Sequence, residues 1–216
     1  IGFSSIENIF GTVQISVANL FGTGQKASVN AEIGKVRKDV SLNYLYPYIF
    51  DTKFIFGVYL LYSDRNYESF DRLERSVRVR VGYPLGWDIT GYMSYGVHLV
   101  EVSDFSRELR LYMQLEEGKT ETTSLEWSLV RNTVDNPYFP TKGSDNRITV
   151  EWASDRFGGN VNFLKYLGQT RWYYPVTAFG TKWMPVFMFN GEGGYAQSLD
   201  GEKIPLAERF FLGGLN

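Results

Sequence analysis

The stretch that decides the fold is Ile9-Phe10-Gly11-Thr12-Val13-Gln14-Ile15-Ser16-Val17-Ala18, in which apolar residues alternate with mostly small or polar ones. Successive side chains of an extended chain point to opposite faces, so Ile9, Val13 and Ile15 share one face. Alternation of this kind predicts a β-strand with one apolar side. The same pattern returns along most of the chain.

Further stretches alternate in the same way, and some carry charge on the polar side. Val77, Val79 and Val81 alternate with Arg78 and Arg80, for example. Matching each stretch to a strand template gives about eleven strands. By residue range they are Ile1–Ser5, Ile9–Ala18, Lys26–Val36, Val40–Tyr46, Lys53–Ser63, Arg75–Tyr83, Ile89–Val102, Thr122–Arg131, Asp145–Trp152, Val161–Tyr174 and Trp183–Ala196.

One stretch is ambiguous. Ser106–Glu116 is the helix candidate of the chain, with Ser106 as a cap and Gly118 as a stop. Its leucines also fit a strand, and we expect a short helix in a surface loop.

The links between the strands are of two chemical kinds that alternate. One kind is short and rich in Pro, Gly and aromatic residues, and the other is charged and often longer. An up-and-down sheet places every second link at the same end, so two link chemistries indicate two surroundings, which a membrane supplies. The aromatic links are Asn19–Gln25, Tyr46–Asp51 and Asp135–Gly143, and the charged links are Arg37–Asp39, Asp64–Glu74 and Asp155–Gly159.

A soluble two-sheet sandwich also produces alternation, so the strand pattern alone leaves that alternative open. The link chemistry and strands of about 9–11 residues favour an all-β fold, a transmembrane antiparallel up-and-down β-barrel. The polar faces of its strands would enclose a water-filled interior. The charged residues expected to line that interior are Arg78, Arg80, Glu126, Glu151, Lys165 and Arg171.

Composition limits the classes of function. The 216 residues include 24 acidic and 22 basic ones, for a net charge of −2, which argues against a nucleic-acid partner. The mean hydropathy of −0.22 is that of a soluble protein but does not exclude a barrel, because half of each strand faces a polar interior. Aromatic residues make up 17% of the chain, which suits the girdles at a membrane interface. Cysteine is absent, which excludes disulfides and zinc–thiolate sites.

Candidate catalytic groups are sparse, and we expect no enzyme, no metal and no cofactor. His98 is the only histidine. The sequence places no nucleophilic serine and no orienting group beside it, as a hydrolase site would need, so we expect His98 to be a hydrogen-bonded residue of the interior. Gly22 and Gly24 lack the further glycines and the helix of a phosphate loop, and a tight turn is expected. Glu116 and Glu117 are expected to form a solvated helix end rather than a cation site.

Four motifs, in this order and spacing, resemble the BamA family of outer-membrane protein assembly factors, whose relatives include TamA and FhaC. The family's first hairpin and first periplasmic turn resemble Ile1-Gly2-Phe3-Ser4-Ser5 and Asn19-Leu20-Phe21-Gly22-Thr23-Gly24-Gln25. Its second turn resembles Tyr46-Pro47-Tyr48-Ile49-Phe50. The strongest match is Asp135-Asn136-Pro137-Tyr138-Phe139-Pro140-Thr141-Lys142-Gly143-Ser144. The lead-in to the family's sixth extracellular loop resembles Glu208-Arg209-Phe210-Phe211-Leu212-Gly213-Gly214. Asn132 and Val134 stand where relatives often have Asp and Arg, which weakens the case for a salt bridge at that turn.

The resemblance implies a sixteen-stranded barrel preceded by POTRA domains. Residues 1–216 would be the N-terminal two-thirds of the barrel domain, with strands one to eleven and the start of extracellular loop six. The POTRA domains and the last strands would lie outside this chain. The implied activity is to fold and insert β-barrel proteins in the bacterial outer membrane. The implied partners are outer-membrane lipids, unfolded barrel clients and accessory lipoproteins docked on the POTRA domains.

The mechanism is expected at the first strand, Ile1, Gly2, Phe3, Ser4 and Ser5. A poorly paired first strand exposes backbone groups on which a client strand can add, largely independently of its side chains. Gly2 has no Cβ and Ser4 and Ser5 are small, so this strand should be easy to bend and weakly held. Opening of the seam and local thinning of the bilayer are implied by the resemblance alone.

The other site residues have structural roles. Proline fixes φ where no ladder partner is needed, and neighbouring aromatic rings can lie at the level of the headgroups. The expected turn residues are Asn19, Gly22, Gly24, Pro47, Tyr48, Asn136, Pro137, Tyr138, Phe139, Pro140 and Gly143, and the loop lead-in residues are Glu208, Arg209, Phe210, Gly213 and Gly214.

Three alternatives stay open at this point. A translocation or secretion pore of the TamA or FhaC kind shares the fold and differs outside this chain. A passive porin needs a long inward-folded third loop, and Asp64–Glu74 is short for one. A soluble β-sandwich binding module would remain in solution without detergent.

Overall fold

The computed structural model describes residues 2–4, 8–67, 70–104, 118–176, 185–205 and 208–210. These residues form one antiparallel sheet of eleven strands, in which each strand pairs with the next along the chain. The predicted number of strands and their up-and-down order are confirmed. The strands are β1 (Gly2–Ser4), β2 (Asn8–Leu20), β3 (Gln25–Ile33), β4 (Arg37–Tyr46), β5 (Ile55–Asn66), β6 (Asp71–Gly86), β7 (Ile89–Ser103), β8 (Gly118–Asn132), β9 (Gly143–Ala153), β10 (Phe163–Pro175) and β11 (Val186–Ser198).

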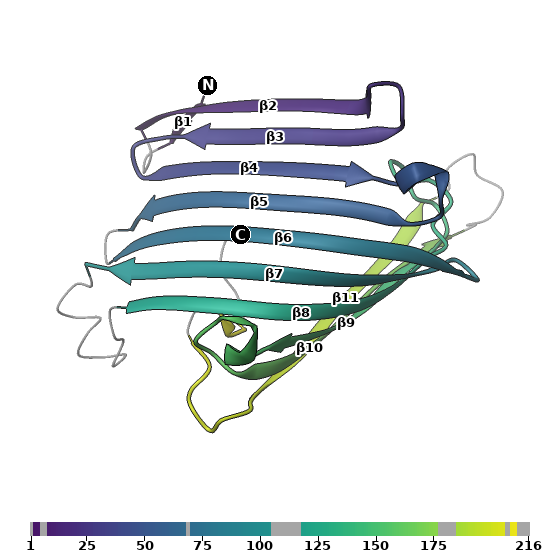
Figure 1. The fold of residues 1–216 in the computed structure, drawn as a ribbon. Helices are drawn as coiled ribbons and strands as arrows, with labels where there is room; N and C mark the ends of the chain where they lie inside the picture. The colour runs from purple at the N-terminus through teal and green to yellow at the C-terminus, as the bar shows by residue number, and fades with distance from the viewer. Residues whose placement is uncertain are drawn as a thin grey trace.

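The sheet is a curved wall. In Figure 1, β2 to β8 lie side by side across the view, and β9, β10 and β11 swing round behind them. From β2 to β11 the strands contain between 9 and 16 residues, at or above the ~9–11 residues of a tilted membrane crossing. No helix in the described ranges is long and apolar enough to span a membrane.

The two faces of the wall differ in chemistry. Residues paired across strands share a face, so Val13 lies with Ala31 and Val79 lies with Tyr95 on the outer face. Val13 is 59% exposed, and no second sheet covers this face within the described residues. Val100, Ala153 and Phe163 are buried on the opposite, inner face, and the other buried side chains of the described residues are polar or charged, such as Thr122, Ser128 and Lys165. The sandwich alternative is therefore wrong for this chain.

The charged links differ from the predicted ones: the first is displaced, the second is shorter, and the one predicted at Asp155–Gly159 is longer and occupies residues 154–162. Arg37–Asp39 begins β4, Asp64–Asn66 ends β5, and Asp71–Glu74 begins β6. Opposite charges extend the ladder here, because Lys38 lies 3.7 Å from Asp64 on the neighbouring strand. The first two links themselves are residues 34–36 and 67–70.

Other strand ends move by a few residues. The predicted strand Lys26–Val36 ends at Ile33, and Lys53–Ser63 begins at Ile55. The chain before β5 is held in a turn instead, a 3₁₀-helix at Ile49–Asp51, where Thr52 Oγ1 donates to the Ile49 carbonyl oxygen at 2.7 Å. Several sequence predictions lie outside the described residues, namely Ile1, Ser5, the start of Trp183–Ala196, the helix candidate Ser106–Glu116 with Glu117 after it, and the lead-in glycines Gly213 and Gly214.

Candidate functional site

Aromatic side chains stand at the tips of the links at one end of the sheet. The links β2–β3, β4–β5, β6–β7 and β8–β9 lie together at the right of Figure 1. Phe21, Trp87 and Tyr138 are 85%, 90% and 85% exposed. Phe21, Phe50 and Trp87 have φ near +50°, a left-handed backbone that bulky residues rarely adopt. The sequence predicted three of these links and missed the one at Trp87, although Gly86 before it is a turn signal.

The first two of these links are tight turns, as expected. The side-chain oxygen of Asn19 accepts a hydrogen bond from the Gly24 N–H at 2.7 Å. Gly22 and Gly24 both have φ of +74°. In the second turn the Tyr48 carbonyl, just after Pro47, accepts from the Asp51 N–H at 3.1 Å.

The β8–β9 link is organised by side chains that bond to the backbone. Asp135 accepts from the Thr141 hydroxyl at 2.5 Å and from the N–H groups of Thr141 and Lys142 at 2.9 and 3.2 Å. The bonds from Thr141, followed by the one from Lys142, hold the pKa of Asp135 well below its ordinary value. The carboxylate therefore stays ionised and keeps the link closed at neutral pH.

A second set of hydrogen bonds in the same link holds its two aromatic residues, Tyr138 and Phe139. Asn136 Oδ1 accepts from the N–H groups of Tyr138 and Phe139 at 2.8 and 3.1 Å, between the two prolines Pro137 and Pro140. Both rings point into the surroundings. Asn132 Oδ1 accepts from the Val134 N–H at 3.0 Å, so a hydrogen bond from backbone to side chain joins the two positions that depart from the family pattern.

The described part of the first strand is short and sparsely paired. β1 pairs with β2 at three positions, Gly2 with Phe10, Phe3 with Ile9 and Ser4 with Asn8. By contrast, β10 and β11 pair from Phe163–Ser198 to Pro175–Val186 without a register shift. Ile1 and Ser5 lie outside the described residues, so weak pairing of the first strand stays a prediction.

Charged side chains form ion pairs on the inner face of the curl. Asp39 accepts from Ser63 Oγ at 2.5 Å and from Arg65 at 2.8 Å, and its carboxylate also lies 3.8 Å from Arg37. Arg78 lies 3.8 Å from Glu126, and the Arg80 guanidinium lies over the Tyr92 ring at 4.9 Å. The predicted interior residues do lie on one face, but the sequence missed further charged residues on that face, such as Asp39 of β4 and Arg65 of β5.

A second group of interior charges surrounds His98. Its two ring nitrogens lie 3.0 Å from Glu74 and 3.1 Å from Glu208. Lys165 donates to the other oxygen of Glu208 at 2.7 Å and lies 3.6 Å from Glu151. His98 is thus the hydrogen-bonded interior residue that the sequence predicted.

The lead-in residues Glu208, Arg209 and Phe210 contact the sheet or their own link. Burial raises the pKa of Glu208, but the hydrogen bond from His98 and the charge of Lys165 outweigh burial and lower it to about 2. Arg209 Nε donates to the Ile204 carbonyl at 2.6 Å. Gly213 and Gly214 lie outside the described residues.

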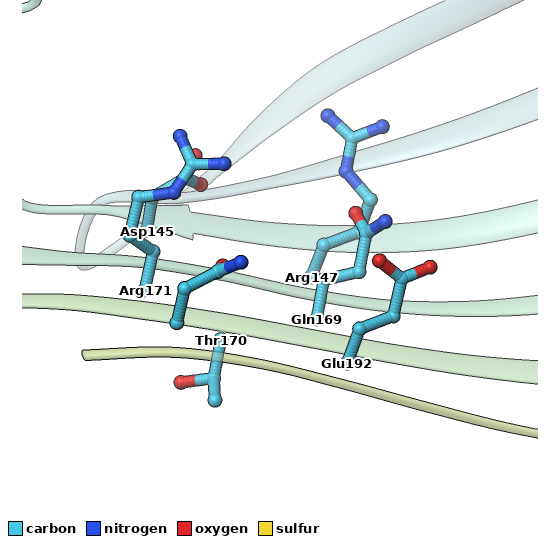
Figure 2. Close-up of a pocket in the computed structure, with 7 residues that line it drawn as sticks. Asp145, Arg147, Gln169, Thr170, Arg171 and Glu192 are labelled. Atoms are coloured by element: carbon cyan, nitrogen blue, oxygen red, sulfur yellow. The ribbon is translucent and has the colours of Figure 1, made fainter. Parts of the chain in front are cut away.

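A polar recess of about 290 Å³ lies farther along the inner face, toward the aromatic end. Figure 2 shows Arg171 beside Asp145, its partner across β10 and β9, and Gln169 beside Arg147 and Glu192. Thr170 points to the other side of the sheet. The recess extends the charged lining along the wall, including the predicted Arg171. Among the described residues, no group of three or more His, Asp or Glu side chains is arranged to hold a metal ion.

Comparison with known proteins gives a consistent family. A profile of the Omp85 superfamily domain matches residues 19–216. The outer membrane protein assembly factor BamA of Nitratidesulfovibrio vulgaris is 23% identical over 218 residues, which cover 100% of this chain and 27% of that protein. A SAM50-like protein of Schizosaccharomyces pombe is 26% identical over 218 residues, covering 98% of this chain and 45% of that protein.

A solved structure shares the fold. The crystal structure of BamA from Haemophilus ducreyi lacking POTRA domains 1–3 matches with a TM-score of 0.74 and 19% identity, over 99% of this chain and 43% of that chain. The chain thus spans less than half the length of these relatives. The likeness shows that the curled sheet is the fold of part of a β-barrel.

Proposed function

The chain belongs to the Omp85 superfamily, and from this we propose that it is part of a β-barrel that folds other β-barrel proteins and inserts them into the bacterial outer membrane. Its relatives named as outer membrane protein assembly factor BamA support this proposal. The proposal concerns the whole protein, of which this chain is the described part.

The main support for this proposal is that the two faces of one curled sheet differ in chemistry. The outer face is apolar and open, while the inner face holds the ion pairs. Exposing so many aliphatic side chains to water is unfavourable by roughly 25 cal/mol per Å², whereas lipid tails remove that cost. The outer face therefore suits outer-membrane lipids, with the aromatic tips at the level of the periplasmic headgroups.

The edge that suits a client is β1. Within the described residues it makes three pairs with β2, fewer than any other two neighbouring strands make. A client strand that adds to such an edge gains main-chain hydrogen bonds that do not depend on its sequence. Many different barrel clients are therefore able to use the same template, and no covalent bond or nucleotide is required.

The remaining partners are proposed from the family. Unfolded clients arrive at the aromatic, periplasmic end of the wall. Accessory lipoproteins bind POTRA domains outside this chain.

Depletion of the whole protein in its host tests this function. We expect the folded amounts of unrelated outer-membrane barrels to fall several-fold within a few generations, measured by their heat-modifiable migration, while helical inner-membrane proteins stay constant. Normal assembly of other barrels would show that the assembly role is wrong. Loss of one secreted protein alone would identify a secretion pore instead.

A further inference from the structure

Glu208 is a buried carboxylate at the end of a link. It follows β11 by ten positions, yet its side chain is only 8% exposed and lies against the inner face of the curl. A buried carboxylate is unfavourable unless cations and donors surround it. The contacts of Glu208 therefore show which residues hold this part of the link in place.

Glu208 joins two strands that are not neighbours. Its Oε1 lies 3.1 Å from His98 Nδ1 on β7, and its Oε2 accepts from Lys165 Nζ on β10 at 2.7 Å. β8 and β9 lie between these strands in the sheet. The Glu208 carboxylate thus links β7 to β10 on the concave face of the sheet.

The bridge is the centre of a row of alternating charges. Arg72 lies 3.0 Å from Glu74, whose other oxygen meets His98 Nε2 at 3.0 Å. Ionised carboxylates only accept hydrogen bonds, so a histidine between two of them must carry a proton on both ring nitrogens. The row then reads Arg72⁺, Glu74⁻, His98⁺, Glu208⁻, Lys165⁺ and Glu151⁻, with no net charge. Each ion in this row has an oppositely charged neighbour on both sides, except Arg72 and Glu151 at the two ends.

An aromatic contact fixes the same segment two residues later. A Cβ added to Gly194 of β11 would lie 2.6 Å from the Phe210 ring, so the ring rests directly on that glycine. Arg209 bonds back to Ile204 within the link. The segment is therefore held at two points, on β7 and β10 through Glu208 and on β11 through Phe210.

From these contacts we infer that Glu208 is a positioning residue that clamps the chain entering the loop after β11 to the inner wall and fixes the curvature of β7 to β10. The inference rests on the barrel of the proposed function and adds a mechanical role to it.

Distances between spin labels test the clamp. The chain has no cysteine, so Glu101→Cys on β7 and Lys203→Cys in the link provide two label sites at exposed positions, with any cysteine elsewhere in the whole protein replaced by serine. In the whole protein in lipid, we expect one narrow distance distribution. Glu208→Gln is expected to widen it at least two-fold, because the amide no longer compensates both cations.

The matched control is Glu202→Gln, the same change at an exposed position of the same link, which should leave the distribution narrow. Lys165→Met should widen the distribution as Glu208→Gln does, and the double variant should be no wider than either, since the residues act as one unit. If Glu208→Gln does not fold, His98→Gln removes one contact and is expected to widen the distribution alone.

A Glu208→Gln distribution as narrow as that of Glu202→Gln would overturn the clamp. The readout is a distance and not an assembly rate. A failed depletion experiment with widened distances would therefore remove the proposed function and leave the clamp in place.

Discussion

Gly143 shows how a single residue type is required by the turn before β9. It has φ of +103°, and a Cβ there would lie 2.2 Å from the backbone oxygen of Thr133. Backbone atoms on both sides are fixed by the bond between the Thr133 N–H and the Ser144 carbonyl at 2.8 Å. No side chain fits without opening the turn.

We therefore expect Gly143→Ala to lower the free energy of unfolding by about 3 kcal/mol or more, from left-handed strain plus the clash. Gly24→Ala is the control, because Gly24 has φ of +74° with open space around its Cα. It should cost about 1 kcal/mol. Urea unfolding of the whole protein in detergent measures both, and equal costs would contradict the steric argument.

The pH dependence of the β8–β9 link follows from Asp135. Its pKa is lowered in the folded state by Thr141 first, so its bonds stabilise the link above the unfolded pKa of about 4 and are lost as the pH falls through the lowered value. Stability should be level from pH 6 to 5 and then decline in acid. Asp135→Asn should flatten part of that decline. An unchanged decline in Asp135→Asn would contradict this role.

Residue identities in these turns were predictable in part. Asn136, Gly143 and the prolines are turn-forming types, and the sequence predicted them as such. Trp87 was missed, although Gly86 beside it is a turn signal, because a tryptophan with φ of +55° is contrary to its local preference.

At the scale of the strands, the local sequence pattern predicts that a strand exists but not where it ends. Alternation predicted every strand, because one face needs apolar residues regardless of neighbours. The charged ends of β4, β5 and β6 were taken for links, since a run of charges is typical of a loop. Their extension depends on pairs such as Arg65 with Asp39, 26 positions apart, which no local pattern reveals.

Adjacent residues of β2 give a test of its two faces. Val13 lies on the outer face and Gln14 on the inner face, and both are exposed. Val13→Arg is expected to destabilise the folded barrel by about 2–4 kcal/mol in a bilayer, because it places a charge in the hydrocarbon. Gln14→Arg should change stability by less than about 1 kcal/mol. Equal effects in reversible unfolding from lipid vesicles would contradict the assignment of faces.

At the scale of the whole molecule, the fold brings together residues that lie far apart in the sequence. His98 and Glu208 are 110 positions apart and meet because the sheet curls. The sequence placed His98 in the interior and Glu208 at the lead-in to a loop, but it gave no reason to join them. Curvature is a property of the complete wall, so the clamp was not predictable from any one segment.

The central claim is that one side of this wall meets lipid and the other encloses water. Single nitroxide labels along β7, from Ile89 to Ser103, in the whole protein in vesicles test it most directly. Oxygen accessibility is expected to peak at Met93, Tyr95 and Val97, and accessibility to a water-soluble nickel complex at Tyr92 and Gly96. Nickel accessibility that is high on the Met93 face, or that lacks a period of two, would contradict the account.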